Sequence, residues 1–137
     1  MAIDEVGNTP IMFFLMIEDF IAVNFILSYC KDVDLSIKNK NGISASALAL
    51  KIKDENVLID QIFMHQTFDK QFVDPYNNNL LMYSVLTDNP YMFIKILNEN
   101  PKSIAQVNNN KENFVILATK LGFLEKVNNY AIRDANF

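Results

Sequence analysis

A pattern of about 35 residues that recurs four times constrains the fold of this chain more than any other feature. Each copy opens with polar turn-forming residues, followed by a short apolar segment, a polar break and a second apolar segment. The copies align when four residues, 35, 35 and 34 apart, share what we name the register position: Phe14, Ala49, Ser84 and Ala118. A period of this length indicates a repeat protein, in which small units stack to bury a common core.

The first copy shows how each unit is expected to fold. Gly7 tolerates the positive φ that a tight turn can need, Thr9 can cap a helix with its hydroxyl, and Pro10 suits the first helical position. After the break, Asp19 precedes an apolar stripe with helical spacing: Phe20, Val23, Ile26 and Leu27. The unit is therefore predicted to be a turn, a short helix, a tight break and a second short helix.

The later copies carry similar helix starts and stops. Asp54 precedes the second apolar segment of its copy, and Asn89 with Pro90 pairs a good N-cap with a proline at the first helical position. Gly122 lies where the first helix of the fourth copy should end. We therefore expect a single all-α domain over residues 1–137, with units of about 4–38, 39–73, 74–107 and 108–137.

These features resemble the ankyrin repeat, which has a period of about 33 residues and the signature Thr-Pro-Leu-His-x-Ala. The first copy is the most similar, although Met12 stands where the family usually has His and Phe14 where it has a small residue. Parts of the pattern persist later: Gly42, Ser44, Ala45 and Ala49 in the second copy, residues 77–80 in the third, and Ala118 and Gly122 in the fourth. The resemblance implies an ankyrin-repeat solenoid of about four helix-turn-helix units, with projecting finger turns and a concave face lined by the first helices.

Composition excludes several functions. A net charge of -4 and scattered basic residues argue against nucleic-acid binding. The apolar runs are too short for direct membrane insertion. The single cysteine, Cys30, excludes an internal disulfide and fits a reducing compartment, so the expected location is the cytoplasm, with the nucleus as an alternative.

No catalytic, cofactor or metal site is expected from the residue pattern. His65 is the only histidine, so no histidine pair can hold a transition metal. Cys30 has no histidine near it in the sequence and is expected to be a buried or half-buried spectator. None of the three glycines belongs to a phosphate-binding loop. The chain is therefore not expected to be an enzyme.

The ankyrin resemblance implies that certain finger and first-helix positions face solvent and bind a partner. The candidates are Val6, Met16, Ile17, Lys38, Lys40, Ile43, Lys51, Ile52, Tyr76, Leu86 and Leu121. Their apolar members are unusual for an idle surface. Alternatively, the divergent repeats have shifted register and these apolar residues belong to the core.

The expected function is a protein-interaction scaffold that binds a peptide or helix of a partner protein, with the lysines offering charge to an acidic flank. Such a module would be the recruitment or adaptor part of a larger regulatory or trafficking protein. The alternative is a structural spacer or self-association module whose apolar surface is covered by its parent chain or a second copy.

The first copy is apolar on nearly all sides, which is unusual for a terminal repeat. A terminal unit needs a polar outer face to stay soluble, yet residues 11–17 are all apolar and Phe20, Ile21, Val23 and Phe25 follow. This pattern predicts either a module of a longer protein or self-association through the N-terminal unit.

Overall fold

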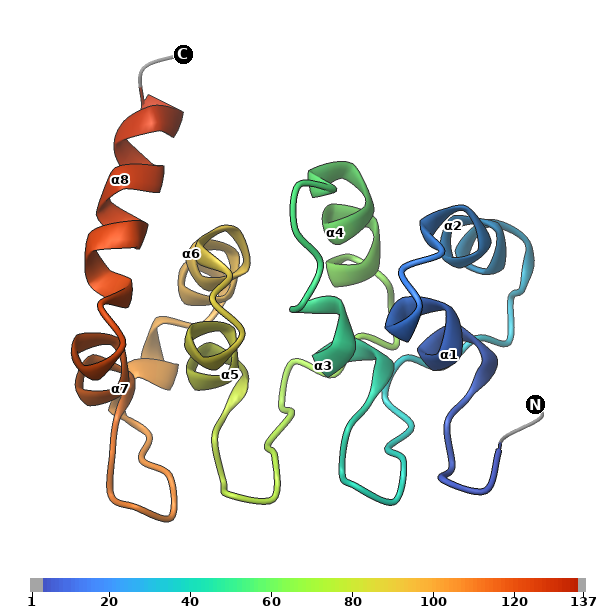
Figure 1. Ribbon diagram of the computed structural model, residues 1–137, viewed down its shortest axis with the longest axis horizontal. Helices are drawn as coiled ribbons and strands as arrows, with labels where there is room; N and C mark the ends of the chain where they lie inside the picture. Colours follow the sequence, from blue (N-terminus) through green and yellow to red (C-terminus); the bar gives the residue numbers. More distant parts are fainter. Residues whose placement is uncertain (1–3, 136–137) are drawn as a thin grey trace. The chain divides into compact units, whose positions relative to one another are not determined.

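The computed structural model describes the backbone of residues 4–135 and the side chains of residues 4–129 (Figure 1). This part of the chain forms eight α-helices, one 3-10 helix and no strand beyond two isolated bridges, which confirms the expected all-α class. The helices are α1 (Pro10–Met16), α2 (Phe20–Tyr29), α3 (Ala45–Ala49), α4 (Asn56–Phe63), α5 (Leu80–Leu86), α6 (Pro90–Glu99), η1 (Pro101–Ala105), α7 (Phe114–Lys120) and α8 (Phe123–Ala135).

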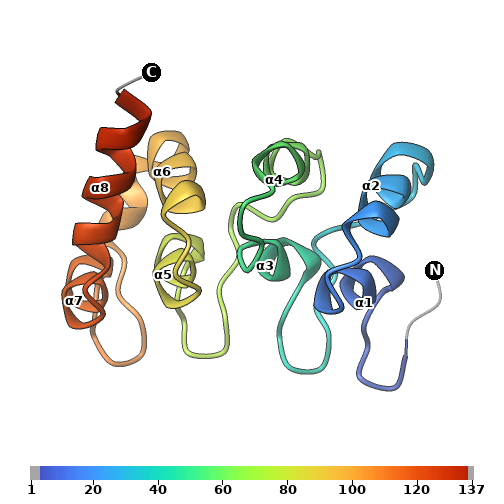
Figure 2. The same cartoon turned by 45° about the horizontal axis from the view of Figure 1, so that its top comes forward.

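The contacts gather into two compact units, Met1–Phe72 and Val73–Phe137, and each contains two repeats. In the first unit, α1 packs against α2 and α3, and α2 packs against α4 (Figures 1 and 2). In the second, α5 packs against α6 and α7, and α6 packs against α8. The boundary between the units lies one residue before the limit expected between the second and third repeats.

The register position is the fifth residue of the first helix in every repeat, so the alignment made from the sequence holds in three dimensions. Ala49, Ser84 and Ala118 are fully buried. Neighbouring helices pack closely at this position, so a small side chain fits there best. Phe14 is half-buried, and its ring meets the ring of Phe13 edge-on at 5.4 Å between centroids.

Two positions of each repeat adopt a left-handed backbone, and together they hold all the described residues with positive φ. Seven residues before the register position, in the finger, lie Gly7, Gly42, Asn77 and Lys111. In the break between the helices lie Glu18, Asp54, Asp88 and Gly122. A non-glycine side chain at such a φ costs about 1–2 kcal/mol, so the surrounding turn imposes this backbone geometry at the five positions that do not carry glycine.

The first helix of each repeat is capped five residues before the register position. Ser44, Asn79 and Asn113 each accept a hydrogen bond from the backbone N–H three residues further on. Thr9 occupies this position in the first repeat, but the prediction that its hydroxyl caps the helix is wrong: Thr9 Oγ1 is buried without a hydrogen-bond partner. The helix begins here because Pro10 already fixes the first helical φ.

The second helices of the repeats also begin at polar N-cap residues. Asp19 and Asn89 accept from the N–H groups of Ala22 and Met92, as expected for N-caps. Asp54 lies within the break, one residue before the N-cap Glu55. The polar residues at the breaks therefore end one helix and begin the next.

Candidate functional site

Each finger is closed by one Asx residue, located ten residues before the register position. These residues are Asp4, Asn39, Asp74 and Asn108. In every case the side-chain Oδ1 accepts the backbone N–H groups two and four residues further on, at 2.8–3.1 Å. Backbone N–H groups of the finger are therefore hydrogen-bonded within their own turn, which makes the finger a rigid surface.

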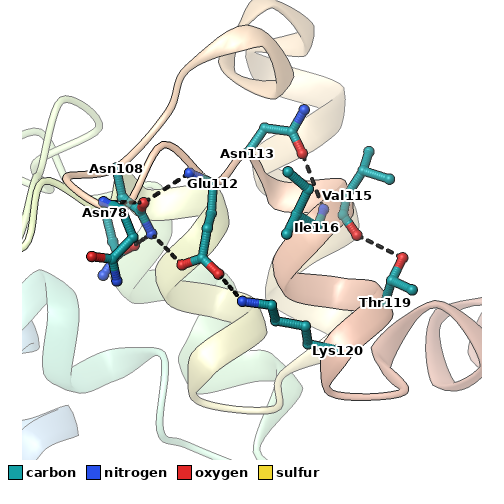
Figure 3. Close-up of polar contacts among 9 residues, drawn as sticks. Asn78, Asn108, Glu112, Asn113, Val115, Ile116, Thr119 and Lys120 are labelled. Carbon is teal, nitrogen blue, oxygen red and sulfur yellow. Dashed lines mark hydrogen bonds and ion pairs between the residues drawn. The ribbon is translucent and has the colours of Figure 1, made fainter.

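Within each unit an asparagine joins the two fingers. Asn39 Nδ2 donates to Asn8 Oδ1 at 2.9 Å in the first unit, and Asn108 Nδ2 donates to Asn78 Oδ1 at 2.8 Å in the second (Figure 3). Backbone bonds run alongside, since Lys40 N donates to Val6 O and Asn109 N donates to Tyr76 O. Only an amide can donate while its oxygen closes the turn, which explains why the second finger of each unit carries Asn instead of Asp.

In the second unit the fourth finger is tied to the end of α7. Glu112 accepts from Asn108 Nδ2 at 3.2 Å and forms an ion pair with Lys120 (Figure 3). The hydrogen bond from Lys120 is the main cause that lowers the pKa of the Glu112 carboxyl, and the bond from Asn108 lowers it further. Lys120, beside the candidate residue Leu121, is thereby held against the finger.

Most candidate residues of the first unit are exposed, as expected for a binding surface. Val6, Met16 and Ile17 are exposed, as are the three candidate lysines, and Ile43 is half-buried. Lys38 also packs on its own unit, with its Nζ 5.3 Å from the centroid of the Phe72 ring. The exposed residues therefore offer both apolar and basic groups.

The prediction that Ile52 lies on the surface is wrong: its side chain is only 3% exposed. The helix that precedes Ile52, α3, ends at the register position, whereas α1 ends at Met16, two residues beyond it. The following break also places its left-handed residue, Asp54, one position later than in the other repeats. This extra residue turns Ile52 inward, so for this position the alternative of a core residue is correct.

In the second unit the three candidate residues Tyr76, Leu86 and Leu121 are all exposed, Tyr76 by 70%. They repeat positions found in the first unit. Tyr76 has the finger position of Val6, Leu86 the helix position of Met16, and Leu121 the C-cap position of Ile17. Exposed apolar residues thus recur at three equivalent positions.

The asparagine runs have structural roles. Asn77 adopts the left-handed φ, Asn78 accepts from Asn108, and Asn79 caps α5 while its amide donates to Ser103 O and Gln106 Oε1. Turn geometry and finger pairing account for each of these three residues.

A second exposed apolar surface lies on the first repeat, outside the candidate residues. Phe13 on α1 and three residues of α2, namely Ile21, Phe25 and Tyr29, are all more than half exposed. In the sequence, this surface is indicated by the apolar composition of the first copy.

Cys30, which follows α2, is exposed, although the sequence led us to expect a buried or half-buried residue. A depression of about 370 Å³ between α2 and α4 is lined by Phe20, Ile21, Asn24, Glu55, Val57, Leu58 and Gln61.

In the part of the chain that the structure describes, no three His, Cys, Asp or Glu side chains are grouped so that they could hold a metal ion. None of the described helices has the length and apolar character needed to cross a membrane. A scan against protein-family models finds no match, and a search of curated proteins finds no significant relative.

Proposed function

We propose that this protein is a protein-interaction module, built as an ankyrin-repeat solenoid of about four units. The four-fold recurrence of finger, short helix, left-handed break and second helix supports this architecture. The module would bind a peptide or helix of a partner protein and serve as the recruitment part of a larger regulatory or trafficking protein.

One observation carries the proposal: exposed apolar side chains occupy the same three positions in different repeats. These are Val6 and Tyr76 in the fingers, Met16 and Leu86 in the first helices, and Ile17 and Leu121 at their C-caps. The core is filled by other residues, so these side chains are not needed to bury the repeat. Apolar groups that recur on a surface are typical of a contact site.

The fingers are suited to binding because they are rigid before a partner arrives. The turn bonds and the Asn39–Asn8 and Asn108–Asn78 bridges hold the finger that carries Val6 and the finger that carries Tyr76. Binding to such a surface loses little conformational entropy. Exposed Lys40 and Lys51 add positive charge, which favours a partner with an acidic flank next to its apolar anchors.

A display library of random peptides, selected on the full chain, tests this function. We expect enriched peptides that combine apolar anchors with Asp or Glu. Affinities measured by titration calorimetry should fall by at least about tenfold in Tyr76→Ser and Leu86→Ser. Met64→Ser is the matched control, because Met64 is as exposed as Tyr76 but lies just beyond α4, away from the fingers and first helices.

Two results would contradict the proposal. A library that yields no enriched sequence would favour a structural spacer. Peptides that bind Tyr76→Ser and Leu86→Ser as tightly as the unchanged protein would place the binding site elsewhere.

A further inference from the structure

One surface position alternates between apolar and basic residues along the four repeats. Two residues beyond the register position, the first and third repeats carry Met16 and Leu86, whereas the second and fourth carry Lys51 and Lys120. All four side chains are exposed. Because α1 packs against α3 and α5 against α7, each unit places an apolar residue of one first helix next to a lysine of the following first helix.

In the fourth repeat, this lysine already binds a carboxylate of its own chain. Lys120 forms an ion pair with Glu112, which lies in the finger six residues before the register position (Figure 3). The other oxygen of this carboxylate, Oε1, accepts from Asn108 Nδ2 at 3.2 Å. An ammonium group and an amide N–H thus hold one carboxylate between the finger and the end of α7, and the pKa of Glu112 is lowered mainly by the lysine.

The finger of the second repeat has the same backbone but a different side chain at this position. Ile43 stands where the fourth repeat has Glu112. The Oδ1 of Asn39 accepts from Ile43 N at 3.1 Å, as the Oδ1 of Asn108 accepts from Glu112 N at 3.0 Å. In return, Asn39 N donates to Ile43 O at 2.8 Å and Asn108 N donates to Glu112 O at 2.9 Å. The turn is therefore conserved between the two fingers, and the carboxylate is missing from one of them.

The donors that would hold this carboxylate are present in the second repeat. Lys51 is exposed, and none of the described carboxylates forms an ion pair with it. Asn39 Nδ2 gives one of its two N–H groups to Asn8 Oδ1 at 2.9 Å, and the other has no acceptor among residues 4–129. Ile43 is half-buried and borders these donors with an apolar side chain that cannot accept a hydrogen bond.

The helix end at this lysine differs slightly between the two repeats. α7 includes Lys120, whereas α3 ends before Lys51, whose N–H donates to Leu48 O. The side chain of lysine is a flexible four-carbon stem, so its ammonium group can turn toward the finger from either backbone.

We propose that the second repeat is an open carboxylate-binding site for the partner. Lys51 and the remaining N–H of Asn39 bind one Asp or Glu side chain of the partner peptide, as the fourth repeat binds its own Glu112. This inference rests on the proposed function, in which exposed Met16 supplies an apolar contact next to this site. Charge-assisted hydrogen bonds fix the position of the carboxylate. Lys120 takes no carboxylate of the partner, because Glu112 already occupies it.

The first test uses the free protein and needs no peptide. Ile43→Glu supplies the missing carboxylate from the chain itself. In an NMR titration the introduced carboxyl should have a pKa below the ordinary value of 4.5, as Glu112 does, and adding Lys51→Met should raise it. Circular dichroism verifies that both variants are folded. The same pKa with and without Lys51→Met would overturn the site.

The second test is a double-mutant cycle with the peptide most enriched in the selection described above. Each Asp or Glu of this peptide is replaced in turn by Asn or Gln, and calorimetry measures its affinity for the unchanged protein, Lys51→Met and Lys120→Met. One replacement should cost roughly two- to fivefold in affinity with the unchanged protein and nothing with Lys51→Met. The same loss should persist in Lys120→Met and shrink at about 1 M salt.

Two further variants test whether the same lysine is involved. Ile43→Glu should abolish the dependence on the peptide carboxylate, because its own carboxylate occupies Lys51. Ile43→Gln, which has the same size without the charge, should keep that dependence. If Ile43→Glu is not folded, the cycle with Lys51→Met still decides.

The outcomes separate this inference from the proposed function. A peptide that depends on Tyr76 and Leu86 but has no carboxylate coupled to Lys51 would overturn the carboxylate site and leave the proposed function intact. A carboxylate coupled to Lys120 would do the same. If the selection yields no binding peptide, the proposed function fails, and a carboxyl pKa that does not respond to Lys51→Met would overturn the site on its own.

Discussion

Replacing Asn108 by Asp separates the two roles of this residue. The Oδ1 of Asn108 closes its own finger by accepting from Asn110 N at 2.9 Å and Glu112 N at 3.0 Å. Its amide donates to Asn78 Oδ1 at 2.8 Å and to Glu112 Oε1 at 3.2 Å. An aspartate keeps the turn, as Asp74 does at the equivalent position, but it cannot donate while ionised.

The expected loss follows from these contacts. Two donated hydrogen bonds contribute about 0.5–1.5 kcal/mol each, and the buried Asn78 Oδ1 loses its donor from the neighbouring finger. The new carboxylate also faces the carboxylate of Glu112. We expect the free energy of unfolding of the second unit to fall by about 2–4 kcal/mol at neutral pH.

The pH dependence of this loss gives an independent check. Burial and the adjacent Glu112 raise the pKa of the introduced carboxyl in the folded state. A group with a raised pKa favours the folded state most below its unfolded pKa, and this contribution is lost as pH rises through the folded pKa. The deficit relative to the unchanged protein should therefore shrink on acidification, because a neutral carboxyl can donate to Asn78 Oδ1 again.

Urea unfolding followed by circular dichroism measures the effect. Asn109→Asp is the matched control, because Asn109 is exposed and contributes its backbone N–H to the finger pairing. It should change stability by less than about 0.5 kcal/mol. Equal effects of the two substitutions at neutral pH would refute the role assigned to the Asn108 amide.

Four further substitutions test individual positions. Thr9→Val should raise the free energy of unfolding by about 1 kcal/mol, because it removes a buried hydroxyl without a hydrogen-bond partner. Ser44→Ala should lower it by about 1 kcal/mol, because the first helix of the second repeat loses its N-cap. Urea unfolding measures both effects. Lys111→Gly should raise the melting temperature, since it relieves a φ of 61°; an unchanged or lower value would count against strain there. In an NMR titration Glu112 should show a pKa below its ordinary value of 4.5, which Lys120→Met should raise. Because the pKa of Glu112 is lowered by folding, its contribution to stability is present above its unfolded pKa and lost as pH falls through the folded pKa.

Much of the local structure could be predicted from the sequence because it depends on residues close together in the chain. The period placed the register position, and Gly7, Gly42 and Gly122 marked left-handed turns that glycine adopts without strain. Asp19 and Asn89 marked helix starts, because their side chains reach a backbone N–H three residues away.

The left-handed backbone at Lys111 and Glu18 could not be predicted from residue type, because neither residue prefers it and the surrounding repeat imposes it. The candidate surface was predicted in part. Leu86 and Leu121 proved exposed because α5 and α7 have the same length as α1, and Tyr76 proved exposed in its finger.

Features that depend on contacts between residues far apart in the sequence were decided only by the tertiary structure. Ile52 is buried because one extra residue in its break turns the side chain inward, and Thr9 lacks a partner because no polar group packs against its hydroxyl. The alternation of Asp4, Asn39, Asp74 and Asn108 is visible in the sequence, but its meaning appears only when the two fingers of a unit lie side by side and join residues 30 or 31 positions apart. An amide and a carboxylate close a turn equally well, so only a neighbouring finger with an acceptor at hydrogen-bond distance makes the difference between them matter.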